Sequence, residues 1–227
     1  MVPRQWIHRL IRLCWAAFVV GCKASSVGVE VPKGGPDAIS MADLQRDVFI
    51  LEAEKSDRAA GTPRLAAAWA SFGDRLRQMK TVPAYGRSYR DTSGAKVVCG
   101  RKDGRVSETV VIAAYDDPAH PSRSTTAMAM VISLAKAWDV RRPPARTLLF
   151  CAWEGEAGLA AFSDRPPIPA ENIVSGVVLG GEPPSLSEAD VHRVAVDFNG
   201  TVARLDFEAM QAATVGVESV VRRSVGE

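Results

Sequence analysis

Apolar residues along the chain form two patterns: continuous runs, typical of buried strands, and residues spaced three and four apart, typical of helices. Runs of apolar residues occupy Ala95–Arg101, Thr109–Tyr115, Arg146–Trp153 and Asn172–Gly181. The first run predicts a short strand, and the other three predict buried strands; the β-branched and small residues of Thr109–Tyr115 indicate burial on both faces of a sheet. A weaker alternation over His192–Phe198 predicts an edge strand.

Helical spacing appears in four other segments. It predicts a helix over Met41–Lys55, an Ala-rich helix from Pro63 to Lys80, and a closing helix that Asp206 caps. The fourth helix lies between the strands at Thr109–Tyr115 and Arg146–Trp153, where Ser124, Thr125 or Thr126 is expected to be its cap.

A strand, a helix and a second strand of these lengths predict a right-handed parallel crossover. The expected fold is therefore a three-layer α/β/α domain with a mixed, mostly parallel sheet. The turn residues Lys102-Asp103-Gly104 lie between Ala95–Arg101 and Thr109–Tyr115. Such a turn predicts that these two strands pair as a hairpin.

The amino-terminal residues have the features of a targeting segment. Residues 1–21 combine a basic start with a short apolar core, and Val19-Val20-Gly21-Cys22 resembles the bacterial lipobox. We expect 1–21 to be a lipoprotein signal, Cys22 to be lipidated, 22–40 to be a tether and 41–227 to be the domain. An ordinary membrane anchor or a cleaved secretory signal remains the alternative. The lipobox reading places the domain at a bacterial cell envelope, lipid-anchored and facing the periplasm or exterior.

Charge and cysteine content narrow the remaining possibilities. The chain has 28 basic and 26 acidic residues, a balance that gives no support for binding nucleic acid. Cys14 lies in the signal and Cys22 is the proposed lipid site, which leaves Cys99 and Cys151 on predicted strands. Export would permit a disulfide between these two, but a pair of buried thiols is an equal alternative.

Carboxylates follow two of the predicted parallel strands. Asp116 and Asp117 end the first strand, and Glu154 and Glu156 end the second. In open α/β sheets the chemistry lies beyond the carboxyl ends of the strands. Glu154 and Glu156 share strand parity, so their side chains are expected to face one side.

The same segments resemble the zinc-dependent exopeptidases of metallopeptidase family twenty-eight. The resemblance rests on four stretches of similar order and spacing: Arg58-Ala59-Ala60-Gly61-Thr62-Pro63 before a helix, Ala114-Tyr115-Asp116, Arg123-Ser124-Thr125-Thr126-Ala127, and Gly155-Glu156-Ala157-Gly158-Leu159. It implies the zinc-exopeptidase fold in a shortened, divergent form.

The family's site holds two zinc ions and a glutamate general base, and most of those side chains are replaced here. Carried over position by position, a histidine ligand becomes Ala114, the bridging aspartate becomes Arg123, the general base becomes Gly155 and a third-strand aspartate becomes Gly180. The resemblance leaves Glu156 as a residue that would bind zinc directly and Asp116 as a supporting residue.

Three functional hypotheses follow from these residues. The first is a non-catalytic binding or scaffold module for a peptide or protein, without a cofactor. The second is a peptide hydrolase with a rewired zinc site built from Glu156, Asp116 and His120, with Glu154 nearby. The third is a remnant without selected activity.

Other interpretations of the same residues remain open. His120 is also explained as a surface-loop histidine, and Glu154 and Glu156 as a solvated acidic turn. In the emptied cleft, beside Asp117, Arg123 is expected to replace the metal by pairing with Glu156 or Asp116.

Overall fold

One mixed sheet forms the centre of the fold. The computed structural model describes residues 39–55, 63–91, 97–117, 121–138, 143–180, 190–194 and 207–225. Six strands lie in the order β1-β2-β4-β3-β5-β6. Strands β4, β3, β5 and β6 are parallel, and β2 and β1 continue the sheet in antiparallel pairing. The predicted mixed, mostly parallel sheet is thus confirmed.

The elements follow the chain in this order: α2 (Met41–Lys55), α3 (Pro63–Gln78), β1 (Val82–Pro83), β2 (Val97–Lys102), β3 (Val106–Asp116), α4 (Pro121–Ala137), β4 (Arg146–Glu154), α5 (Gly155–Asp164), the short 3-10 helix η1 (Ala170–Asn172), β5 (Ile173–Leu179), β6 (Asp190–Val194) and α6 (Phe207–Val225).

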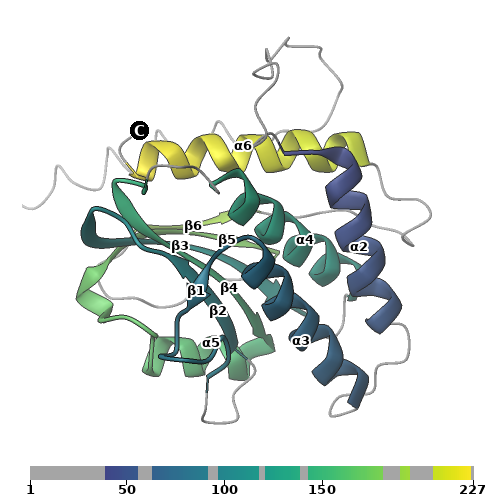
Figure 1. Ribbon diagram of the computed structural model, residues 1–227, viewed down its shortest axis with the longest axis horizontal. Coiled ribbons are helices and arrows are strands. Elements are labelled where there is room, and N and C mark those ends of the chain that lie inside the picture. Colours follow the sequence, from purple (N-terminus) through teal and green to yellow (C-terminus); the bar gives the residue numbers. More distant parts are fainter. Residues whose placement is uncertain are drawn as a thin grey trace, which may run out of the picture. The chain divides into compact units, whose positions relative to one another are not determined.

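Helices cover both faces of the sheet, so the predicted three layers are present. The larger apolar core joins α2, α3, α4 and α6 to one face, which in β3 carries Val110, Ile112 and Ala114. The opposite face, with Val111 and Ala113, packs mainly against α5 (Figure 1). In the part of the chain that the structure describes, no helix is both long and apolar enough to cross a bilayer.

Most predicted elements are confirmed. The helix at Met41–Lys55 and the strand beginning at Arg146 have the expected bounds to within one residue. Strand β6 lies at the sheet edge, as expected, and begins at Asp190, two residues before the predicted start; residues 195–198 of the predicted strand lie outside the described residues. The expected cap Asp206 lies outside the described residues.

The predicted hairpin between β2 and β3 is wrong. Strand β2 pairs with β4, and β3 lies on the other side of β4. The turn between them therefore crosses the start of β4, where the Gly104 N–H donates to Thr147 Oγ1 at 3.0 Å. A Cβ atom on Gly104 would lie 2.2 Å from the carbonyl carbon of Arg146. Gly104 permits this close crossing rather than a tight hairpin.

The expected cap of α4 is also wrong. The helix begins at Pro121, three residues before Ser124, and proline suits a first helical position. Ser124, Thr125 and Thr126 are buried within the first turns. Ser124 Oγ donates instead to the carbonyl oxygen of Asp117 at 3.0 Å.

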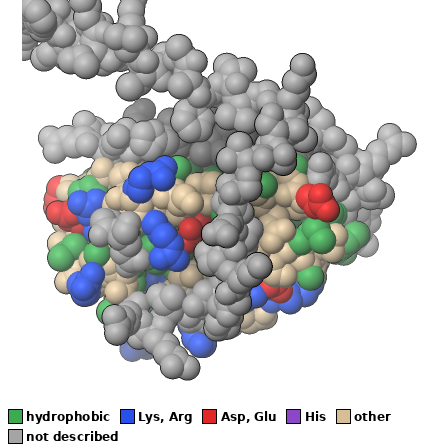
Figure 2. All heavy atoms as spheres, turned by 90° about the horizontal axis from the view of Figure 1, so that it is seen from above, with side chains coloured by type: hydrophobic (Ala, Val, Ile, Leu, Met, Phe, Trp, Pro, Cys, Tyr) green, Lys and Arg blue, Asp and Glu red, His purple; other side chains and the backbone are tan. Residues whose placement is uncertain are grey.

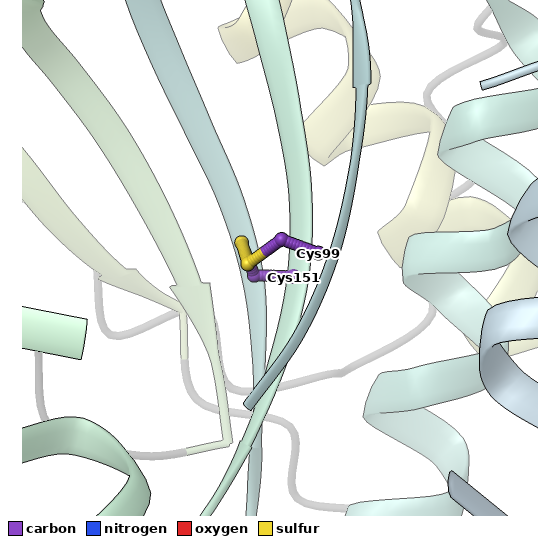
Figure 3. Close-up of a disulfide and its surroundings, with 2 residues drawn as sticks. All are labelled: Cys99 and Cys151. Atoms are coloured by element: carbon purple, nitrogen blue, oxygen red, sulfur yellow. A yellow bond between two sulfur atoms is a disulfide. The ribbon is translucent and has the colours of Figure 1, made fainter. Parts of the chain in front are cut away.

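Cys99 and Cys151 form a disulfide across β2 and β4 (Figure 3). They are direct register partners with Cα atoms 4.2 Å apart. Cys99 directs its backbone N–H to the Tyr89 carbonyl and accepts from the Ala84 N–H, both away from β4. The two cysteines therefore occupy a non-hydrogen-bonded pair, where facing side chains approach most closely. The structure favours the disulfide over two separate thiols.

Candidate functional site

Two buried carboxylates lie side by side at the carboxyl ends of the central strands. Asp116 of β3 and Glu154 of β4 are register partners and are 3% and 8% exposed. Alternation along each strand places them on the same face as Ala114 and Ala152, which belong to the core beneath the larger helical layer. The sequence prediction that strand ends gather carboxylates is confirmed for this pair.

Glu156 does not share the position predicted from strand parity. Strand β4 ends at Glu154, and α5 begins at once with Gly155, whose φ is +56°. That left-handed conformation, which glycine adopts at little cost, turns the chain from strand to helix. Glu156 is consequently an exposed residue of the first turn of α5.

A tyrosine holds Glu156 in this turn. The Tyr115 hydroxyl donates to Glu156 Oε1 at 3.0 Å. Burial raises the pKa of Tyr115 to about 12, and the hydrogen bond and charge of Glu156 and the charge of Asp117 add to the shift. The phenol therefore remains a hydrogen-bond donor throughout the neutral range.

The start of α4 borders the same strand ends. Arg123 is half-buried in its first turn, and Asp117 is half-buried just after β3. Thr125 Oγ1 donates to Glu52 Oε2 of α2 at 2.9 Å, which ties the two helices together at this end. The predicted pairing of Arg123 with Glu156 or Asp116 stays a prediction.

Two positions that the family resemblance assigns to metal ligands have structural roles here, one in the core and one in a turn of the backbone. Ala114 is fully buried in the larger core. Gly180 has a φ of +82°, and a Cβ atom there would lie 3.7 Å from Ala127 Cβ and 3.8 Å from the Tyr115 carbonyl oxygen. Gly180 therefore meets a conformational need, because its surroundings would accept a Cβ atom and only its positive φ favours glycine.

A metal site does not emerge from the described residues. No group of three or more histidine, cysteine, aspartate or glutamate side chains within them could hold an ion. The candidate ligands are divided instead, since Glu156 bonds to Tyr115 while Asp116 and Glu154 lie on the opposite face of the sheet. His120 and the proposed lipid site Cys22 lie outside the described residues.

Two hydrogen bonds at this edge, Tyr115–Glu156 and Thr125–Glu52, were not predicted from the sequence. Tyr115 alternates with Asp116, so it had to face the opposite side of the sheet, and this parity could have identified it as a residue of that side. No sequence signal relates Glu52 to Thr125, which are 73 residues apart in the chain.

The fold is similar to those of several solved enzymes. A zinc-dependent exopeptidase from Parabacteroides distasonis aligns over 83% of this chain and 99% of its own, with 10% identity and a TM-score of 0.61. A leucine aminopeptidase precursor from Bacteroides thetaiotaomicron aligns over 83% and 98%, with 9% identity and a TM-score of 0.62. A glutaminyl cyclase from an Acidobacteriales bacterium aligns over 85% and 97%, with 13% identity and a TM-score of 0.62.

Sequence comparison adds nothing to this likeness. No protein-family model matches the chain, and no curated protein matches it. The alignments cover nearly the whole length of each of these structures, and this establishes the architecture. Sequence identities this low do not show that the activities are shared. The chain has the zinc-exopeptidase-like α/β fold.

Proposed function

We propose that this chain is a peptidase-like lipoprotein of the bacterial cell envelope that binds a peptide or protein without hydrolysing it. The observation that carries the proposal is the structural use of Ala114, Gly155 and Gly180. Ala114 fills the core, and Gly155 and Gly180 have positive φ angles at the ends of strands. Side chains that would bind zinc or act as a general base are replaced by residues that these turns and this packing favour.

The carboxylates at the same edge support a ligand of positive charge. Asp116 and Glu154 are buried there, and Asp117 and Glu156 are more exposed. Carboxylates make strong, charge-assisted hydrogen bonds to ammonium groups. A peptide with a free amino terminus or a basic side chain suits this edge.

The lipid anchor is supported by the sequence before the domain. A basic and then apolar segment ends at Cys22, and it is too short to span a bilayer. Labelled palmitate is expected to enter the wild-type protein and not Cys22→Ser. Equal labelling of both would overturn the anchor.

A metal-dependent peptide hydrolase is the second candidate. It is favoured by the zinc-dependent exopeptidases among proteins of this fold, although Glu156 and Asp116 lie on opposite faces of the sheet. In this case a single zinc would be held by Glu156, Asp116 and His120.

One experiment separates the two candidates. The full chain, purified from membranes in detergent, is loaded with zinc, dialysed, and measured for metal content. It is also assayed for release of amino-terminal residues and, given the glutaminyl cyclases of similar fold, for cyclisation of amino-terminal glutamine. We expect no stoichiometric zinc and neither activity. One tightly held zinc per chain that is lost in Glu156→Ala, but kept in the exposed-site control Glu171→Ala, would establish the hydrolase instead.

A further inference from the structure

Among its described side chains, helix α2 exposes apolar residues, while Asp43, Asp47 and Glu52 are buried or half-buried. The exposed residues of its described part are Met41, Ala42, Arg46, Phe49, Ile50 and Ala53. Phe49 is 56% exposed, and Met41 and Ile50 are each 37% exposed. Surface helices ordinarily place apolar residues toward the core and charges toward water. An outer face with this composition indicates that something apolar covers it.

Asp43 and Asp47 of α2 pair with cations of α2 and of the neighbouring helices. Asp43 bonds to Lys136 of α4 and to Arg46 at 2.8 Å, and the 2% exposed Asp47 bonds to Arg75 of α3. Leu44, Val48 and Leu51 fill the larger core between these charges. Arg46, Lys136 and Arg75 thus pair with Asp43 and Asp47.

The apolar outer face continues onto α6. Phe49 stacks on Phe207, the first residue of α6, with ring centroids 6.5 Å apart. Figure 1 shows α2 and the start of α6 together at one end of the molecule, and Figure 2 shows hydrophobic side chains grouped at that end. We call Phe49, Ile50 and Arg46 the outer patch.

The chain before α2 identifies what can cover the outer patch. Eighteen residues separate Cys22 from Met41. A fully extended chain of that length reaches at most about 65 Å, so a lipid on Cys22 would keep α2 near the bilayer. Phenylalanine and aliphatic side chains beside a basic residue are the composition that enters a membrane interface. Arg46 pairs with Asp43 and Asp47, and its 49% exposed side chain can also meet anionic headgroups.

We propose that the outer patch docks on the bilayer that holds the lipid of Cys22. Phe49 and Ile50 enter the boundary between headgroups and acyl chains, and Arg46 contacts anionic headgroups. This docking rests on the proposed lipid anchor. It would fix the orientation of the domain on the membrane, because the anchor and the patch together make two points of attachment.

A labelled cysteine tests the docking directly. Ala53→Cys places a probe on the exposed side of α2, and Ala160→Cys places a matched probe on an exposed alanine of α5, across the sheet. Cys99 and Cys151 are paired and buried, so they do not react. The processed full chain is labelled with a polarity-sensitive fluorophore and reconstituted into phosphatidylcholine–phosphatidylglycerol vesicles that contain a lipid-borne quencher.

We expect the probe at position 53 to shift to the blue and to be quenched by the lipid, and the probe at position 160 to do neither. Adding Phe49→Asp to the protein labelled at position 53 is expected to lower the ratio of docked to undocked protein about tenfold. The reason is that a half-exposed phenylalanine is lost from an apolar contact. Val106→Asp, which alters a 50% exposed apolar residue at the start of β3, is expected to have no effect.

Mass spectrometry of the same sample measures the lipid on Cys22. The lipid anchor and the docking can therefore be contradicted independently. Lipid on Cys22 with equal quenching at both positions overturns the docking alone. A blue shift at position 53 that depends on protein concentration without vesicles assigns the patch to a second copy and also overturns it. A chain without lipid on Cys22 overturns the anchor and, with it, the docking.

Discussion

The Tyr115 hydroxyl and Glu156 Oε1, 3.0 Å apart, join the end of β3 to the first turn of α5. Strand β4 lies between β3 and the helix in the chain, so this bond closes the edge where the strands end. The remaining surface of Glu156 is exposed. Glu156, which the family resemblance assigns to zinc binding, therefore accepts a hydrogen bond from Tyr115.

Replacing Glu156 with glutamine is expected to lower the pKa of Tyr115 from about 12 toward its ordinary value, since the negative charge that opposes the phenolate is removed. Ultraviolet titration of the phenolate, compared with Tyr115→Phe to assign the signal, measures the shift. Glu171→Gln, at an exposed glutamate, should leave the titration unchanged. An unaltered Tyr115 midpoint in Glu156→Gln would contradict the contact.

The same contact contributes to stability in a defined pH range. Because the folded pKa of Tyr115 is raised, its contribution is fully present below about pH 10 and is lost as the pH rises through about 12. At pH 7, Tyr115→Phe should reduce the free energy of unfolding by about 0.5–1.5 kcal/mol, the usual net value of a hydrogen bond. Urea denaturation measures the loss. An equal cost of Tyr115→Phe in a Glu156→Ala background, which has no side-chain acceptor, would show that the loss does not come from this bond.

Arg123 is expected to pair with Asp116 or Glu156. Arg123→Ala should then lower the free energy of unfolding by about 1–2 kcal/mol at pH 7 and by less at pH 4, where carboxylates approach neutrality. Thermal melts at both pH values measure the difference. Arg87→Ala, at an exposed turn arginine, serves as the control. A loss that is the same at both pH values would mean that Arg123 acts through packing alone.

Asp43 provides a pH effect in the acid range. Burial raises its pKa, but the hydrogen bond and charge of Lys136 and the charge of Arg46 outweigh burial and lower the pKa overall. Its contribution to stability is therefore present above about pH 3.8 and is lost as the pH falls through the lower folded value.

Asp43→Asn should therefore cost about 1–3 kcal/mol of unfolding free energy at pH 7, in the range for hydrogen bonds to charged groups, and much less in strong acid. Urea denaturation at the two pH values tests this. Asp74→Asn is the matched control, because Asp74 has a 57% exposed side chain paired with Arg77. A cost of the same size in acid would show that the charge of Asp43 is irrelevant.

Removal of the disulfide is expected to be the largest single change. A crosslink between residues 52 apart in the chain restricts the unfolded state by about 4 kcal/mol in the chain-entropy estimate. The double substitution Cys99→Ala with Cys151→Ala should lower stability by about that amount under oxidising conditions. A reducing agent added to the denaturation should destabilise the wild type and leave the double variant unchanged.

Much of the fold could be predicted because its signals are local. The parallel crossover follows from two apolar runs and a helical segment between them, and α2 follows from residues within fifteen positions. Pairing between strands is not local. The turn before β3 is typical of a hairpin, yet β2 pairs with β4, because the parallel partners β4 and β5 occupy both edges of β3.

The candidate site was predicted less completely for the same reason. Asp116 and Glu154 could be placed together because parallel strands end at a common edge. The position of Glu156 depended on where β4 stops, and the chain turns at Gly155 into a helix that strand parity does not foresee. The cysteines left two alternatives open, since only the register between β2 and β4 brings Cys99 opposite Cys151.

The burial of Cys99 and Cys151 has a consequence for the order of events during maturation. Both cysteines are fully buried, between the sheet and the layer that contains α5. An oxidant or disulfide-exchange enzyme cannot reach thiols enclosed in this way. The bond must therefore be made while that side of the protein is still open, before α5 closes over it. Disulfide formation must then precede the packing of this layer. A chain that packs the layer while reduced would keep its thiols inaccessible to later oxidation.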